Sequence, residues 1–260
     1  MVSRLGCAKR FSQGFLFNLN YSYGHALDTI SNGGRLPFVA STNASETAVS
    51  NPYNVRGMYG NADYDVRHNM SANFVWDDFI HRMIKRGPSR LMGGWTVSGT
   101  IFHRTGLPFT VIDTSVSSGI LNYAGDTFAQ ITGKPGHTCG KSAVDVSCFG
   151  DTAFDSPTGF SNQARNQFFG PNFTNMDMSV TKNFRVTERV VLRIGASAYN
   201  VFNHPNFDQP DHDLNSGLVK DGGTFGQIVS TVGPPTSIFG AFVGSQNAPR
   251  ALQFKAEVKF

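Results

Sequence analysis

The sequence of 260 residues has few charged side chains and no long apolar run. Charged residues make up 15% of the chain, and 22 basic against 18 acidic side chains leave a formal charge of only +4. So small a charge gives no case for nucleic-acid binding, and no nucleic-acid partner is expected. Because no apolar stretch approaches the ~18–20 residues of a membrane-spanning helix, such a helix is excluded. Leucine occurs 12 times against 23 phenylalanines and 28 glycines, which does not suit a helical bundle.

Enzyme motifs are also missing. The sequence contains no Gly-x-Ser-x-Gly elbow, Walker motif, zincin motif or Cys-x-x-Cys pair. The charged cluster of Asp63, Asp65, Arg67 and His68 could hold a catalytic carboxylate pair, but a solvated rim where a loop meets a strand is the favoured interpretation. We therefore expect no enzyme activity, and we predict no catalytic, cofactor-binding or metal-binding residue.

What the sequence does contain is a repeated alternation of apolar and polar residues. From Phe15 to Tyr23 every second residue is aromatic or leucine, and most residues between them are polar. This period of two is typical of a β-strand with one apolar and one polar face. Five later segments repeat it, which predicts strands at approximately residues 14–25, 68–77, 94–104, 174–185, 189–201 and 250–260. Residues Ser3 to Phe11 could be the tail of a seventh strand. At about ten residues each, the strands match the ~9–11 of a tilted transmembrane strand and exceed the ~5–6 of soluble strands.

The connections between these strands alternate in length. Long connections run from Ala26 to Arg67, from Thr105 to Asn172 and from Phe202 to Pro249, whereas the two between them are shorter. Outer-membrane barrels have this alternation, with long loops outside the cell and short periplasmic turns. Soluble domains rarely carry structureless loops beyond ~12–15 residues. The long connections are rich in Gly, Asn, Ser, Thr and Pro, so we expect solvated extracellular loops.

Aromatic residues recur at the strand ends next to the short turns. Such residues would form half of an aromatic girdle at one membrane boundary. The predicted girdle residues are Phe15, Trp76, Trp95, Phe184 and Phe260. The open alternative is that aromatic residues favour strands and lie near strand ends by chance. Lys182 is out of place on the outward face, but near the strand end its amine could extend to the lipid headgroups.

Several motifs occur in an order that is familiar from one family. They include Arg56-Gly57-Met58-Tyr59-Gly60, Gly93-Gly94-Trp95, Thr105-Gly106-Leu107-Pro108-Phe109-Thr110, Phe169-Gly170-Pro171, Lys182-Asn183-Phe184, Tyr199-Asn200-Val201-Phe202-Asn203-His204-Pro205 and the closing segment from Pro249 to Phe260. This ordered set resembles the C-terminal barrel of TonB-dependent receptors. More specifically, it resembles the Oar-like branch, whose members carry an N-terminal carboxypeptidase-regulatory-like domain.

The resemblance implies a 22-stranded barrel in the outer membrane of a Gram-negative bacterium, with an N-terminal plug that TonB opens. This chain supplies six or seven strands, and its first residues lack the apolar segment of a signal peptide. We therefore expect residues 1–260 to be the C-terminal part of a longer receptor, without plug or signal peptide. The implied partners are outer-membrane lipid and lipopolysaccharide, the plug and remaining strands, TonB through the N-terminal part, and the barrel-assembly machinery.

Phe260 and two cysteines are the remaining candidate residues. A last strand that ends in an aromatic residue resembles the signal read by the barrel-assembly machinery, and this interpretation of Phe260 is favoured over that of a strand residue without a recognition role. Cys139 and Cys148 lie nine positions apart in the longest connection, where oxidation outside the cytoplasm would form a disulfide worth ~2–3 kcal/mol. A metal site with His137 is disfavoured because the paired ligand spacing of zinc sites is missing.

The sequence thus predicts an antiparallel transmembrane β-barrel segment that contributes barrel wall and ligand-binding loops to a receptor. A siderophore, a glycan and a peptide fit equally well as the ligand. The competing hypothesis is a soluble or surface-exposed β-rich adhesion or carbohydrate-binding module, in which the apolar faces would pack against each other as a sandwich.

Overall fold

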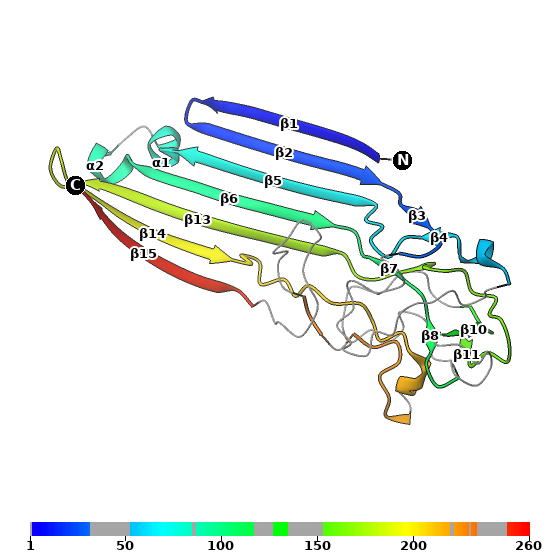
Figure 1. Cartoon of the computed structure of the whole chain (residues 1–260). Helices are drawn as coiled ribbons and strands as arrows, with labels where there is room; N and C mark the ends of the chain where they lie inside the picture. The colour runs from blue at the N-terminus through cyan, green and yellow to red at the C-terminus, as the bar shows by residue number, and fades with distance from the viewer. Residues whose placement is uncertain are drawn as a thin grey trace.

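The computed structural model describes residues 2–31, 53–84, 87–116, 127–134, 153–218, 221–228, 230–232 and 249–260. Its main feature is a seven-stranded antiparallel sheet in which each long strand pairs with the next long strand along the chain (Figure 1). Across the sheet the strands are β1 (Val2–Ser12), β2 (Phe15–Gly24), β5 (His68–Asp77), β6 (Trp95–Arg104), β13 (Phe173–Arg185), β14 (Val191–Tyr199) and β15 (Ala251–Lys259). The expected all-β antiparallel architecture is confirmed.

Six of these strands begin and end within two residues of the segments expected from the alternation. The seventh, β1, is a full strand that pairs with β2 from Val2 to Ser12. Its alternation is weak because Cys7 and Lys9 occupy the positions opposite Leu19 and Phe17. The expectation of a strand tail at Ser3 to Phe11 therefore understated its length.

The strand register places most apolar residues of β2, β5, β6, β13, β14 and β15 on one face. In antiparallel pairs, residues that lie directly opposite each other share a face of the sheet. Phe15 lies opposite Trp76, Trp76 opposite Val97, and Val97 opposite Val180. Val180 in turn lies opposite Ala196 on β14. The face defined by these residues is called the apolar face below, and the opposite one the polar face.

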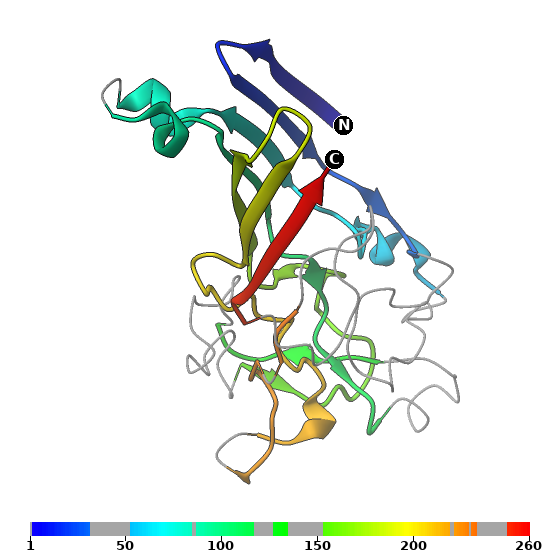
Figure 2. The ribbon, with the colours of Figure 1, turned by 90° about the vertical axis from the view of Figure 1, so that its left-hand side faces the viewer.

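The short connections lie together at one end of the sheet (Figure 1). Strands β1 and β2 are joined by Gln13 and Gly14, both at positive φ, which is the conformation of a tight hairpin turn. The β5–β6 connection contains two short helices, α1 (Phe79–Met83) and α2 (Ser89–Met92). Figure 2 shows this connection projecting to one side of the sheet. None of the helices in the described part of the chain has the length and apolar character needed to cross a membrane.

At the other end, the described parts of the long connections fold against one another into what we call the loop assembly. Short strands pair within it: β3 (Leu27–Asp28) with β4 (Gly60–Asn61), β7 (Pro108–Phe109) with β12 (Phe168–Phe169), β8 (Ile112–Asp113) with β9 (Thr127–Phe128), and β10 (Gln130–Ile131) with β11 (Phe154–Asp155). Two 3-10 helices, η2 (Val55–Met58) and η3 (Leu214–Ser216), complete its regular elements among the described residues.

The loop assembly has an apolar core of its own, which corrects the expectation of solvated loops. Phe168, at 1% exposure, packs between Phe109 and Phe154, with ring centroids 5.9 and 5.6 Å away. Phe225, from the third long connection, is fully buried, and its ring centroid lies 6.0 Å from that of Phe154. These rings come from segments far apart in sequence, so no local periodicity marks them.

The second and third long connections are also joined by polar contacts. The main-chain nitrogen and hydroxyl of Thr114 donate hydrogen bonds of 3.1 and 2.6 Å to the carboxylate of Asp213. At the base of the assembly, Val232 packs with Phe102 and Phe173, two residues on the polar face of the sheet. The third connection therefore folds back over the polar face where the strands end.

Candidate functional site

The apolar face of the sheet is the first candidate functional surface. Large apolar side chains on its last strands are open to the surroundings, with Phe254 80% and Leu252 65% exposed. No second sheet covers this face within the described residues. A sandwich module would bury it, and a soluble protein rarely exposes so continuous an apolar surface. An outward apolar face of this kind is what a membrane barrel presents to lipid.

All five predicted girdle residues lie at the short-turn end. Phe15 begins β2, Trp76 is next to the last residue of β5, Trp95 begins β6, and Phe184 is next to the last residue of β13. Phe260 follows β15 and is 99% exposed. Phe15 and Trp76 contact each other edge to face, with ring centroids 6.0 Å apart. Their role as a girdle, and that of Phe260 as an assembly signal, stay predictions.

Lys182 does not extend away from the protein as expected. Its side chain is buried, and its amine donates hydrogen bonds to the main-chain oxygens of Arg90 and Leu91, at 3.1 and 3.2 Å, and of Gly93. The same amine lies 5.4 Å from the ring centroid of Trp95. The carbonyls of α2 and the face of the ring hold the charge where headgroups were expected.

The charges on the polar face pair with one another. Glu257 lies in the centre of the group, 3.9 Å from Arg193, 3.6 Å from Lys255 and 3.8 Å from Lys259. All four side chains are about one-third exposed or more, so these contacts stabilise the strand pair only weakly.

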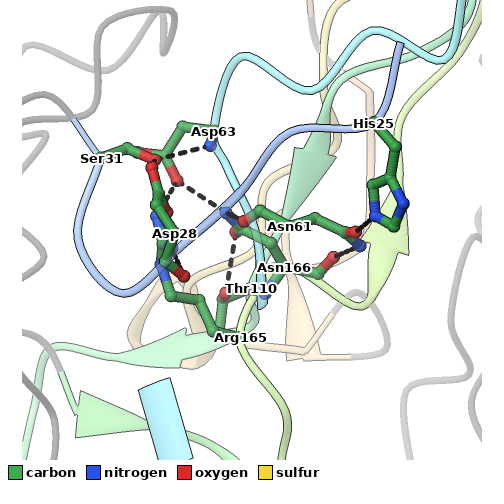
Figure 3. Close-up of polar contacts among 8 residues, drawn as sticks. All are labelled: His25, Asp28, Ser31, Asn61, Asp63, Thr110, Arg165 and Asn166. Atoms are coloured by element: carbon green, nitrogen blue, oxygen red, sulfur yellow. Dashed lines mark hydrogen bonds and ion pairs between the residues drawn. The ribbon is translucent and has the colours of Figure 1, made fainter. Parts of the chain in front are cut away.

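At the junction of sheet and loop assembly lies a buried polar cluster, which corrects the expectation of a solvated rim. Asp63 and Asp65 are only 7% and 1% exposed. Figure 3 shows eight residues of this cluster: His25, Asp28, Ser31, Asn61, Asp63, Thr110, Arg165 and Asn166. They come from the first and second long connections, so the cluster joins segments more than 100 residues apart.

Arg165 is the centre of this cluster. Its side chain is 3% exposed, and its guanidinium donates to Ser31 Oγ at 2.7 Å, to Asp63 Oδ1 at 2.8 Å and to the carboxylate of Asp28. It also donates to the main-chain oxygen of Asp28 at 3.3 Å. A guanidinium suits this position because its planar fork of donors can serve several acceptors at once.

Asn166 extends the cluster toward both long connections. Its amide nitrogen donates to Asp63 Oδ1 at 2.6 Å and to the main-chain oxygen of Asn61 at 2.7 Å. Its main-chain nitrogen donates to Thr110 Oγ1 at 2.8 Å. Asn166 has a φ of +52°, which asparagine tolerates better than most residues. The pair Arg165-Asn166 thus fastens the first long connection to the second.

Asp65 and Arg67 fix the start of β5 in the same way. Asp65 accepts hydrogen bonds from the main-chain nitrogen of Ala26 at 2.7 Å and from Arg67 Nε at 2.6 Å. Arg67 also donates to Asn61 Oδ1 at 2.9 Å. His68 lies apart, with Nδ1 2.7 Å from the hydroxyl of Tyr21. Sequence reasoning grouped these four residues by proximity, whereas the structure gives them different partners.

Asp63 is the acidic residue of the cluster whose pKa is shifted. Burial raises the pKa of its carboxyl above the usual range, while Asn166 and Arg165 oppose the rise and Asp28 adds to it. Its Oδ2 is buried without a hydrogen-bond partner. The other contacts satisfy the cluster internally, and the described residues contain no group of three His, Cys, Asp or Glu that could hold a metal ion. The arrangement suits a structural junction better than a catalytic carboxylate pair.

Beside the junction lies an open groove that the sequence did not single out. It has a volume of about 470 Å³ and is lined by Thr29, Val55, Arg56 and Tyr59. Tyr59 is 60% exposed. The groove belongs to the first long connection. Only the resemblance motif that contains Arg56 and Tyr59 could have drawn attention to it.

The remaining candidates include the two cysteines of the second long connection. Cys139 and Cys148 lie outside the described residues, so the disulfide stays a prediction. Cys7 is a free, exposed cysteine on β1.

Comparison with known proteins gives one match. A sequence model of the outer membrane beta barrel domain family matches residues 4–253, which is nearly the whole chain. No curated protein and no solved structure matches the chain. The match agrees with the strand lengths, the exposed apolar face and the loops gathered at one end. The chain therefore belongs to the outer membrane beta barrel domain family, and its location is the outer membrane.

Proposed function

We propose that the chain is part of a TonB-dependent receptor of the Oar-like branch, in which it supplies barrel wall and ligand-binding loops. The observation that carries the proposal is the packed loop assembly at one end of the sheet. Its core rings and the Arg165 cluster pack the described parts of the three long connections against one another. Binding sites gain affinity when their groups are ordered before the ligand arrives, and a barrel that only anchored a protein would have no use for such an assembly.

The open edges of the sheet support a larger barrel. Within the described residues, no strand pairs with the outer edge of β1 or of β15. In lipid, each unpaired backbone group costs several kcal/mol, so a barrel wall must pair both edges. The proposal therefore includes further strands, a plug inside the wall, and TonB as the partner that opens it.

The groove beside the junction is the proposed contact for ligand. Arg56 offers charge and hydrogen-bond donors, and the exposed ring of Tyr59 offers an apolar surface beside them. A pocket with a few polar groups among apolar ones is the usual form of a small-molecule site. A siderophore, a glycan and a peptide remain equal candidates for the ligand.

Uptake measurements in the native host test this function. The solutes are ferric siderophore from the host's own culture medium, labelled maltodextrin and labelled tripeptides. We expect the uptake of one solute class to fall to background both in a strain without the gene and in a strain without TonB. Arg56→Ala with Tyr59→Ala lowers the same uptake, whereas Arg185→Ala, at the opposite end of the sheet, leaves it unchanged. Uptake that survives the loss of TonB contradicts the proposal.

A second candidate, a carbohydrate-binding surface module, is favoured by exposed aromatic rings in the loop assembly. Tyr53 is 88% and Phe160 44% exposed, and their ring centroids lie 6.3 Å apart. Exposed apolar patches of this kind mark binding surfaces. Binding of whole cells to immobilised glycan that needs the gene but not TonB favours this function over uptake.

A further inference from the structure

The connection between β5 and β6 carries a feature that transport does not explain. It includes Arg82, Lys85, Arg86 and Arg90, and its acidic residue, Asp78, accepts a hydrogen bond of 2.8 Å from the main-chain nitrogen of Gly94. The segment also supplies apolar side chains from α1 and α2. A short segment that combines cationic and apolar side chains is typical of structures that lie in a membrane interface.

This connection is fastened to the apolar face of the sheet. Lys182 and Trp95, which share that face, both donate to the main-chain oxygen of Leu91, at 3.2 and 2.8 Å. The ring centroid of Phe79, at the start of α1, lies 6.1 Å from that of Trp76, which is also on the apolar face. Both helices therefore lie beside the surface that faces lipid in an outer-membrane barrel (Figure 2).

The connection leaves both apolar and cationic side chains open. Met83 is 68%, Ile84 51% and Leu91 63% exposed. Arg82 and Arg90 are exposed as well, and neither forms a salt bridge with any described residue. Lys182 already occupies the carbonyls at the end of α2, so among the described residues of the connection Arg82 and Arg90 are the arginines available to a partner.

We propose that the β5–β6 connection binds the phosphate headgroups of anionic phospholipids at the membrane surface beside the short turns. Two observations select this occupant. The exposed apolar side chains continue the lipid-facing surface of the sheet, so they enter the same bilayer at its boundary. The arginines beside them match the charge of phosphate, which a guanidinium can bind through paired hydrogen bonds. The proposal does not depend on a transport function, because any barrel of this family meets the same lipid.

The two tryptophans of the chain make a direct experiment possible. Within residues 1–260, Trp76→Phe leaves Trp95, which contacts the connection through Leu91, as the only tryptophan, and each tryptophan in the rest of the receptor is replaced by phenylalanine as well. This parent, with the full chain purified from outer membranes, is reconstituted into phosphatidylethanolamine vesicles. The vesicles contain either brominated phosphatidylglycerol or the same mole fraction of brominated phosphatidylethanolamine. Because bromine quenches tryptophan fluorescence at short range, the ratio of the two quenching constants reports which headgroup gathers at the connection.

We expect brominated phosphatidylglycerol to quench about fivefold more strongly, since basic residues near a membrane surface concentrate anionic lipid. Arg82→Gln with Arg90→Gln lowers the ratio without abolishing quenching by either lipid, because two of the basic residues of the connection are lost. The matched control, Arg4→Gln with Lys255→Gln, removes two charges from the polar face and keeps the parental ratio. Persistent quenching by brominated phosphatidylethanolamine shows that each variant is still folded and embedded.

Three outcomes overturn the proposal. A parental ratio near one removes the headgroup preference, and an unchanged ratio in the double arginine variant removes the role of these residues. Unbrominated lipid A that displaces brominated phosphatidylglycerol better than unbrominated phosphatidylglycerol does would assign the surface to lipopolysaccharide instead. The quenching ratios do not depend on TonB-dependent uptake. A failure of the proposed transport function is therefore distinguishable from a failure of the proposed headgroup binding.

Discussion

Side chains of the same residue type are exposed on the sheet and buried in the loop assembly. On the sheet, Phe254 is 80% exposed, whereas in the loop assembly Phe168 and Phe225 are 1% and 0% exposed. Arginine shows the same difference, because Arg165 is buried among acceptors in the loop assembly while Arg193 on the sheet is partly exposed. The two regions face different solvents. A strand in lipid places apolar side chains outward, whereas loops in water must bury them to be ordered.

The comparison implies that the loop assembly can be loosened without loss of the sheet. The largest effect is expected from Arg165→Met, which leaves Asp28, Ser31 and Asp63 without their shared donor. Removing one partner of a buried ion pair costs about 3–5 kcal/mol. Amide hydrogen exchange in detergent should show this loss in the loop assembly and unchanged protection in β13 and β14.

The matched control is Arg193→Met. Its nearest carboxylate lies 3.9 Å away and both partners are partly exposed, so a change of at most ~1 kcal/mol is expected. If the two variants lose equal protection, the Arg165 cluster is not the fastening that joins the long connections.

A comparable loss is expected for Phe168→Ala, which leaves a cavity between Phe109 and Phe154. Large-to-small changes of buried aromatic residues cost ~3–5 kcal/mol. Phe254→Ala removes the same side chain from the apolar face and should leave protection of the loop assembly unchanged. Limited proteolysis with mass mapping of both variants checks the pair, and equal sensitivity would show that the assembly has no independent core.

A smaller effect is expected where the sheet continues into the loop assembly. A Cβ on Gly106 would overlap the main-chain oxygen of Gly170, so Gly106→Ala must move backbone and should cost about 1–3 kcal/mol. Gly159→Ala is the control, because among the described residues beyond its two chain neighbours no atom lies within 4 Å of the position that its added methyl group would take. Thermal unfolding of the loop assembly, followed by near-ultraviolet circular dichroism, measures both. An unaffected Gly106 variant would show that this junction is not tightly packed.

The smallest effect concerns pH. Burial raises the pKa of Asp63 above its ordinary value of 3.8 in the folded state. The folded state therefore holds the proton more strongly, and this stabilisation is present below pH 3.8 and is lost as the pH rises through the folded pKa. Asp63→Asn removes this titration, so its stability relative to the parent should rise across that window.

Hydrogen exchange of the loop assembly at a series of pH values above 3.8 measures this difference. Asp155→Asn, at an exposed position of β11, controls for the loss of one carboxylate. A difference between Asp63→Asn and the parent that falls with rising pH would falsify the assignment of burial as the dominant cause.

The strands could be predicted because their signal is local. The alternation from Phe15 to Tyr23 needs only the pleat of a strand and one apolar surrounding, and the later strands repeat it. Strand β1 was understated because Cys7 and Lys9 interrupt its apolar face. The prediction that the charged cluster is solvated was wrong for a related reason. Asp63 and Asp65 look solvated in sequence, since the partner that buries Asp63, Arg165, lies 102 residues away.

By itself, the sequence determined the antiparallel strands, their length and the face that meets lipid, because a period of two and a lipid surrounding act residue by residue. Only the tertiary structure decided the loop assembly. Phe109, Phe154, Phe168 and Phe225 become a core only when segments far apart in the chain meet. Arg165 becomes a fastening only when burial removes the water that would otherwise serve its acceptors.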